Sequence, residues 1–114
     1  PLVRAVETAE IVAQCYEGLR VVQVPAFAPG GAPEEYLAWL RQHKGADTVA
    51  LVGHEPDLGL LVGWLLTGRR NSFIEVKKGS ICLVEFGRRI EPGGAILQWF
   101  LKASQLELLG DAQP

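Results

Sequence analysis

An apolar run that ends in a histidine is the part of this chain best suited to chemistry. Val49 to Val52 are apolar, Gly53 follows them, and His54 comes next. The run predicts a buried strand, and Pro56 suits the first position of a helix over residues 56–66. A histidine at the carboxyl end of a strand, beside the unpaired amides of a helix N-terminus, could hydrogen-bond a phosphoryl group. The alternative is a surface histidine in an ordinary strand-to-helix turn.

A second candidate lies near the start of the chain, where apolar residues recur at intervals of three and four: Leu2, Val6, Ala9, Ala13 and Tyr16. This spacing predicts an amphipathic helix over about residues 2–17. Arg4 lies near its N-terminus, where a cation opposes the helix dipole, and a bound anion would remove that conflict. Thr8 could orient the Arg4 side chain, whereas Glu7 could pair with it instead. The alternative for Arg4 is a solvated surface arginine.

The two segments resemble motifs of the histidine phosphatase (phosphoglycerate mutase-like) superfamily, and most closely its SixA-like phosphohistidine phosphatases. Pro1 to Ala9 match the family's S-P-L-x-R-A-x-x-T-A motif from its proline onward, and Val52 to Pro56 match V-G-H-x-P. Three weaker matches follow the same order along the chain: the helix expected over Glu34 to Leu40, Lys78-Gly79-Ser80 before a strand, and Gly94 to Trp99. The resemblance therefore covers nearly the whole chain.

The resemblance implies a phosphohistidine phosphatase, which transfers a phosphoryl group to water through a covalent phosphohistidine intermediate. Arg4 would be the second arginine of the phosphate pocket, and His54 would hydrogen-bond the phosphoryl group and stabilise its charge in the transition state. Glu55, Thr8 and Lys78 are further candidates for substrate binding. Glu55 and Asp57 could also act as acid or base, although carboxylates favour helix N-termini for dipole reasons alone.

One departure from the family matters for activity, because the chain has no Arg-His-Gly motif to supply the nucleophilic histidine. Its only histidines are His43 and His54. His43 is expected at the end of a helix, before Gly45, and there a structural role suits the helix dipole. We therefore expect a histidine phosphatase-like domain that is truncated at its N-terminus, and a fragment that is inactive by itself. Two alternatives stay open: a non-catalytic phosphate-binding or interaction module, and a superfamily phosphatase acting on a small phosphomonoester.

Composition narrows the remaining possibilities. The 114 residues suit one domain, residues 1–114, and a net charge of −2 gives no basic face for nucleic acid. Cys15 and Cys82 match no metal or redox spacing, so we expect no metal, no cofactor and a reducing compartment. The apolar run Leu58 to Leu66 is too short to span a membrane. The resemblance implies a cytoplasmic signalling protein whose partner is a phosphorylated protein or a small phosphomonoester.

Strands and helices are expected to alternate along the chain. The predicted strands cover residues 19–24, 48–53, 81–86 and 95–101, and the predicted helices cover about 2–17, 34–40, 56–66 and 104–109. Such alternation predicts a three-layer α/β/α sandwich around a mixed, mostly parallel sheet, in which the last two strands form a hairpin. By the resemblance, this sandwich would lack the family's first strand and first helix. Ligands of such sheets bind beyond the carboxyl ends of the strands, where His54 is expected.

Overall fold

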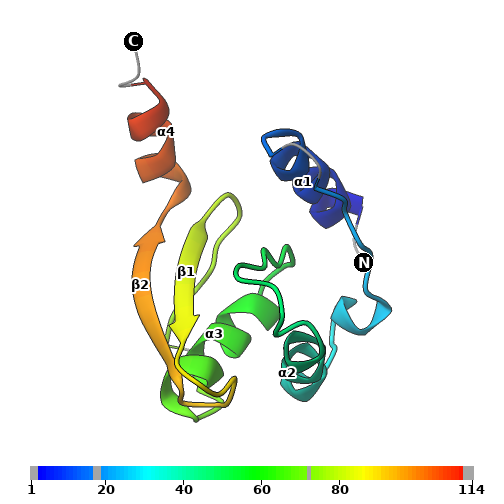
Figure 1. Ribbon diagram of the computed structural model, residues 1–114. Helices are drawn as coiled ribbons and strands as arrows, with labels where there is room; N and C mark the ends of the chain where they lie inside the picture. The colour runs from blue at the N-terminus through cyan, green and yellow to red at the C-terminus, as the bar shows by residue number, and fades with distance from the viewer. Residues whose placement is uncertain (1–2, 17–18, 72, 112–114) are drawn as a thin grey trace.

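The computed structural model describes residues 3–16, 19–71 and 73–111. Its elements, in chain order, are α1 (Val3–Gln14), the short 3-10 helix η1 (Pro25–Phe27), α2 (Pro33–Gln42), α3 (Asp57–Thr67), β1 (Ile81–Phe86), β2 (Ala95–Leu101) and α4 (Ala103–Asp111). Figure 1 shows the hairpin β1–β2 along one side of α3 and α2 along the other. α1 lies apart from the hairpin, and α4 extends beyond the end of β2. No helix in the described part of the chain is long and apolar enough to cross a membrane.

The predicted three-layer α/β/α sandwich is wrong. Within the described residues the sheet has two strands, β1 and β2, which pair antiparallel, and the segments 19–24 and 48–53 form no strand. Leu19 and Val22 are 58% and 64% exposed, so the first segment does not form part of a sheet core. An apolar, β-branched run indicates burial, but it becomes a strand only where a partner backbone accepts its hydrogen bonds. Among the described residues, neither segment has such a partner.

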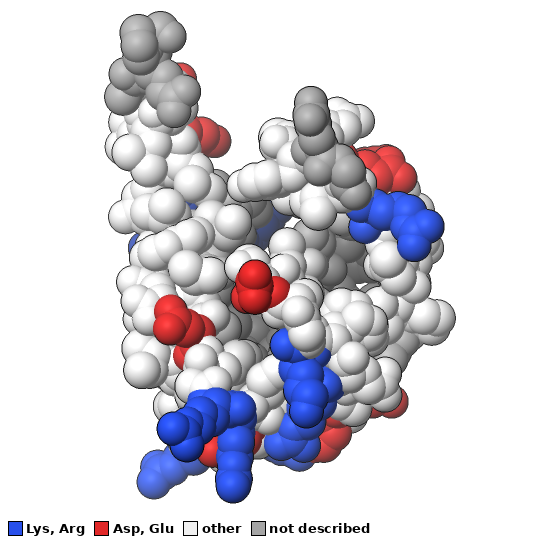
Figure 2. Space-filling view, viewed as in Figure 1, with Lys and Arg blue, Asp and Glu red and all other residues white. Residues whose placement is uncertain are grey.

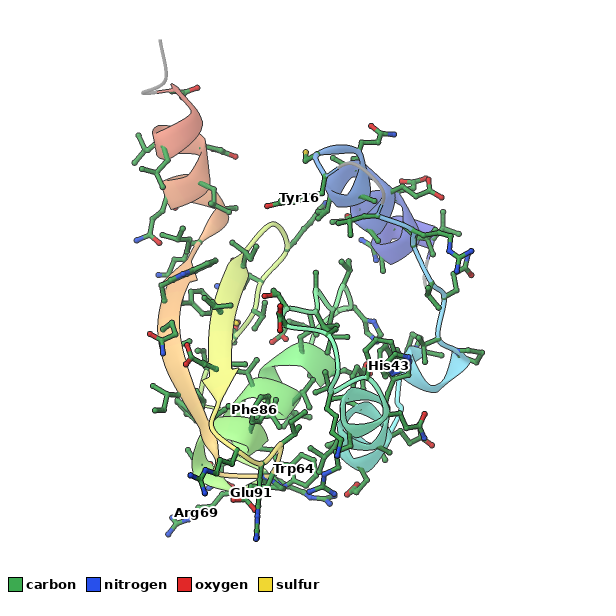
Figure 3. All side chains as sticks on the ribbon, viewed as in Figure 1. Tyr16, His43, Trp64, Arg69, Phe86 and Glu91 are labelled. Carbon is green, nitrogen blue, oxygen red and sulfur yellow. The ribbon has the colours of Figure 1, made fainter. Side chains whose placement is uncertain are left out.

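The predicted hairpin is confirmed, with strands at the predicted bounds. Ile81 pairs with Leu101 and Phe86 with Ala95, and a bulge interrupts the register between Leu83 and Val84. Alternate side chains of β1 are half-buried and exposed, as expected for a sheet with one covered face. Phe86 points from β1 toward α3 (Figure 3) and packs against the core. The predicted final helix is also confirmed, as α4.

α3 is the centre of the core, because six of its eleven residues are buried. The core cluster combines residues of η1, α2, α3 and β2: Phe27, Tyr36, Leu37, Leu61, Trp64, Leu65 and Ala95. The predicted helices in this region are confirmed, since Pro33 opens α2 and Pro56 precedes α3. α3 ends where Gly68 adopts a positive φ of 76° and its N–H donates to the Trp64 carbonyl. The Gly93 N–H donates to the same carbonyl at 3.1 Å, which ties the hairpin loop to this helix end.

Two glycines one turn apart let the backbone carbonyls of Asn71 and Ile74 lie directly against α3. A Cβ at Gly59 would lie 2.6 Å from the carbonyl oxygen of Ile74, and a Cβ at Gly63 would lie 2.7 Å from that of Asn71. Both distances are shorter than a van der Waals contact, and both neighbours are backbone atoms that cannot rotate away. The side of α3 that carries these glycines therefore has to stay free of side chains.

Gly63→Ala is expected to lower the free energy of unfolding by about 1–3 kcal/mol, because the added methyl group overpacks this contact. The matched control is Gly110→Ala in α4, where an added Cβ meets nothing within 4 Å. There the better helix propensity of alanine should leave stability unchanged or raise it by up to about 1 kcal/mol. Urea unfolding of the three proteins measures the difference. Equal stability of the two variants would contradict the close approach.

Candidate functional site

His54 lies between the extended segment 48–53 and α3, and its ring faces Asp57, the first residue of the helix. The His54 Nε2 atom is 3.1 Å from the Asp57 Oδ2 atom, and the two side chains are 16% and 10% exposed. Nε2 is shielded from solvent, and the ring is turned so that the contact is not an aligned hydrogen bond. Rotation about χ2, a soft torsion in histidine, would align it. With the ring aligned in this way, Asp57 would hold Nε2 and Nδ1 would be left for a ligand.

Asp57 contacts more than the histidine. Its Oδ2 atom also accepts a hydrogen bond from the Gly30 N–H at 3.1 Å, which fastens the glycine-rich loop after η1 to the start of α3. Its charge also reaches Tyr36: burial, followed by the negative charges of Asp57 and Glu35, raises the pKa of Tyr36 to about 12. The carboxylate is itself favoured at this position, the positive end of the helix dipole. One charged group therefore links His54, a distant loop and the buried face of α2.

The His54 ring lines a small cavity together with residues of α1. The cavity has a volume of about 50 Å³, and its wall includes Ala5, Val6 and Ala9 of α1, residues 21–24, Phe27, Val52 and Gly53. This volume holds about three to five water-sized groups, and a phosphate ion has five non-hydrogen atoms. Gln23 and His54 are its polar side chains, and no arginine or lysine among the described residues lines it. The structure thus brings the α1 segment and the His54 segment to one hollow.

Arg4 is next to this cavity in sequence but does not line it. Its side chain is exposed on α1, one residue before Ala5. Thr8 does not orient the guanidinium, because its hydroxyl donates to the Arg4 backbone carbonyl at 3.0 Å, within the helix. A side chain as long as that of arginine would have to turn from solvent toward the cavity to meet an anion there.

Two amides in the first turn of α3 are already hydrogen-bonded. The Leu58 N–H donates to the His54 carbonyl at 3.0 Å, and the Gly59 N–H donates to Glu55 Oε1 at 2.6 Å. Glu55 therefore caps the start of α3 in this structure. Its carboxylate accepts the Gly59 N–H, and Glu55 does not line the cavity. The helix N-terminus offers an anion fewer donors than the sequence alone leads us to expect.

The other basic candidates lie elsewhere. Lys78 lines a different groove, which has no residue in common with the His54 cavity. Arg69 follows the C-terminal end of α3, at the lower end of the molecule where basic side chains gather (Figures 2 and 3), whereas His54 precedes its N-terminal end. Arg70 pairs with Glu34, and its guanidinium lies 5.2 Å from the centre of the Trp64 ring. Arg70 thereby stabilises the α2–α3 contact at the far end of the helix.

His43 has the structural role expected of it. It caps the C-terminal end of α2, its ring stacks on Trp39 with the ring centres 3.9 Å apart, and Nδ1 lies 2.8 Å from the Trp39 carbonyl oxygen. Cys15 is exposed and Cys82 half-buried, and both are free thiols. In the described ranges, no three His, Cys, Asp or Glu side chains are grouped so that they could hold a metal ion.

Comparison with known proteins adds a relative without a described activity. An uncharacterized protein of Picosynechococcus sp. (strain PCC 7002) is 36% identical over 83 residues, which cover 71% of this chain and 50% of the relative. The chain therefore spans about half the length of that relative. No protein-family model matches the chain, and no solved structure gives a significant match. Function is therefore inferred from the geometry around His54 and from the motifs.

Asp57→Asn is expected to lower the free energy of unfolding by about 1–2 kcal/mol, because it removes a charge-assisted contact at a helix N-terminus. The amide shift of Gly30, which donates to this carboxylate, should move as well. Asp47→Asn is the matched control, since Asp47 is exposed in the loop after α2; its effect should stay within about 0.5 kcal/mol. Equal effects of the two substitutions on urea unfolding would show that the contacts of Asp57 with His54 and Gly30 do not stabilise the fold.

The raised pKa of Tyr36 predicts how the free energy of unfolding depends on alkaline pH. Its pKa rises from 10.0 in a free side chain to about 12 in the fold, so below pH 10 both states keep the proton and no stability is lost. Above pH 10 the unfolded chain loses the proton first, and this group lowers stability by up to about 1.4 kcal/mol per pH unit until the folded pKa is passed. Tyr36→Phe should remove this slope. Urea unfolding of both proteins from pH 9 to 12 measures it, and identical slopes would contradict the assignment.

Proposed function

We propose that this chain supplies part of a phosphoryl-transfer site of the histidine phosphatase kind, with phosphohistidine on a protein as its best-matched substrate. The observation that carries the proposal is the His54 cavity. The two segments that resemble the family's motifs are far apart in the sequence, yet α1 and His54 contribute to the wall of the same hollow. Two motifs that matched by chance would not require this proximity.

In this proposal His54 donates a hydrogen bond to the phosphoryl group. A doubly protonated ring can direct Nε2–H toward Asp57, 3.1 Å away, and present Nδ1–H to a phosphoryl oxygen at the same time. A donor held in this way stabilises the negative charge that develops on the oxygens in the transition state. Asp57 is a positioning residue, because it acts on the phosphoryl group only through the orientation of the ring.

Arg4 supplies the fixed positive charge. Its planar guanidinium could bind two phosphoryl oxygens at once if the side chain turned from solvent along α1 toward the cavity. The side chain is exposed in this structure, and an anion in the cavity would favour the inward rotamer. Because the cavity wall is otherwise largely apolar, a charge pair formed there would be less screened than one on the surface.

The size of the cavity bears on the substrate. About 50 Å³ admits a phosphoryl group and leaves the rest of the substrate outside. A phosphorylated side chain carried by another protein meets this condition, and so does a small phosphomonoester that extends into solvent. The nucleophile would be a histidine in an Arg-His-Gly motif, which these 114 residues do not contain. Hydrolysis is therefore proposed for the protein that supplies this motif.

A non-catalytic phosphate-binding module is the second candidate, and one observation favours it. Among the described lining residues, His54 has the one side chain that readily carries a charge. If it is committed to binding, no second group of this lining can accept the phosphoryl group covalently.

We expect the 114-residue chain alone to turn over neither phosphohistidine nor phosphate esters, because it lacks the Arg-His-Gly motif that would supply the phosphoryl acceptor. Assays of phosphate release from a phosphohistidine protein and from a chromogenic phosphomonoester measure this. Turnover that disappears in His54→Ala would instead make His54 the nucleophile and would overturn its assignment as a hydrogen-bond donor.

Vanadate, an analogue of the transferring phosphoryl group, should bind a protein that combines this chain with the Arg-His-Gly motif, and Arg4→Ala should weaken that binding by about 1.5–3 kcal/mol, the range for a hydrogen bond to a charged group. His43→Ala is the control, because His43 stacks on Trp39 outside the cavity and should leave the affinity unchanged. Calorimetric titration measures all three proteins. Equal affinities of the wild type and the Arg4 variant would show that Arg4 is a surface arginine that does not bind the anion.

A further inference from the structure

A second and larger hollow carries positive charge. Its volume is about 620 Å³, within the range of small-molecule sites, and it lies between the segment that precedes β1 and the start of α4. Three lysines line it: Lys77, Lys78 and Lys102. We call this hollow the lysine groove. It has no residue in common with the His54 cavity, so the proposed phosphoryl site does not account for it.

The lysine groove is held together by the sheet rather than by loops alone. Ile81 pairs with Leu101 at the end of the hairpin, so the residues just beyond this pair, Ser80 and Lys102, emerge side by side. The Ser80 N–H donates to the Lys77 carbonyl at 2.8 Å and closes a turn. Gly79, with a positive φ of 79°, sits so close to α4 that an added Cβ would lie 3.0 Å from the Ala103 Cβ. This contact holds the turn, with its two lysines, against the start of α4.

The charge of the lysine groove differs in sign from that of the whole chain. One carboxylate lines it, that of Glu75, whose Oε2 atom is 3.9 Å from the Lys77 Nζ atom. Three lysines and one glutamate leave two positive charges in the groove of a chain whose net charge is −2. The hydroxyls of Ser80 and Ser104 also line it and can donate to anionic oxygens. An anionic ligand would find both charge and donors here.

Two aromatic rings complete the wall. Phe73 and Phe100 line the groove, and Phe73 is 59% exposed, although it is a large apolar side chain. A ligand that covered this ring would remove apolar surface from water, and a flat ring system would add stacking. The lysine groove therefore combines the two features that a nucleotide needs: cations for its phosphates and an apolar ring for its base.

We propose that the lysine groove binds a nucleotide, with the lysines on the phosphates and Phe73 against the base. An acidic peptide would use the same charges but would gain little from the phenylalanine ring. The volume, which suits a drug-sized molecule, favours the nucleotide. The proposal does not depend on the His54 site.

The test compares ADP, inorganic pyrophosphate and adenosine by calorimetric titration of the full chain. ADP should bind more tightly than either fragment, with an affinity that falls as salt is added. Lys78→Gln combined with Lys102→Gln should weaken ADP binding by about tenfold, since each exposed ion pair contributes only modestly to affinity. Phe73→Leu, which removes the ring but stays apolar, should weaken ADP binding and leave pyrophosphate binding unchanged. Circular dichroism shows whether each variant is folded.

Lys44→Gln is the matched control, because Lys44 is exposed and lies outside the groove, and it should leave ADP affinity unchanged. Three results would overturn the proposal. These are an ADP affinity that equals that of pyrophosphate, a double lysine variant that binds ADP like the wild type, and an acidic peptide that binds more tightly than ADP at the same charge.

Discussion

The carboxylate of Asp57 is the group on which the arrangement around His54 depends. It lies in the first turn of α3, where the helix dipole favours a negative charge. From this position it meets the His54 ring, accepts a hydrogen bond from Gly30 and places its charge near the buried Tyr36. A charge that is one-tenth exposed and shared among three partners constrains each of them more than a surface ion pair would. The position of the His54 ring and the path of the loop at Gly30 therefore depend on the same carboxylate.

α3 in turn gives Asp57 a rigid support. Its buried face joins α2 to the hairpin, and its glycine side admits the backbone carbonyls of Asn71 and Ile74. The two ends of α3 make different contacts. Asp57, Glu55 and His54 gather at the N-terminal end, whereas Trp64, Gly68 and the arginines lie at the other, where the helix contacts the hairpin loop and α2. A helix this firmly held can fix a side chain at its end, which is what an oriented hydrogen-bond donor requires.

Local signals make part of this fold predictable from the sequence. Proline opens α2, and a second proline precedes α3; a glycine ends α3; and two alternating runs joined by a glycine-containing loop form the hairpin. The strand predictions for segments 19–24 and 48–53 are wrong because pairing depends on a partner elsewhere in space, which an apolar run cannot specify. The same limit applies to the sandwich, whose layers need those strands.

The site is predictable to a similar extent. The motifs single out His54 and α1, which share a cavity. The exposed Arg4 side chain and the contact of Glu55 with the start of α3 match the alternatives that general propensities already offered, but the motifs could not decide between these and a site role. The charge of Lys78 and its place before a strand suggest the phosphoryl site, but the hairpin register directs it to another groove. The spacing of His54 and Asp57, three residues apart at a helix start, is the available signal for their contact, since such residues lie on one face.

His54 is proposed to meet a phosphoryl group through one ring nitrogen while Asp57 occupies the other. The most direct measurement is nitrogen NMR of the histidine side chains during a titration with inorganic phosphate. We expect that the Nδ1 resonance of His54 shifts with added phosphate, that its Nε2 resonance changes little, and that both resonances of His43 stay in place. A titration in which His54 does not respond, or responds no more than His43, would contradict this role of the histidine.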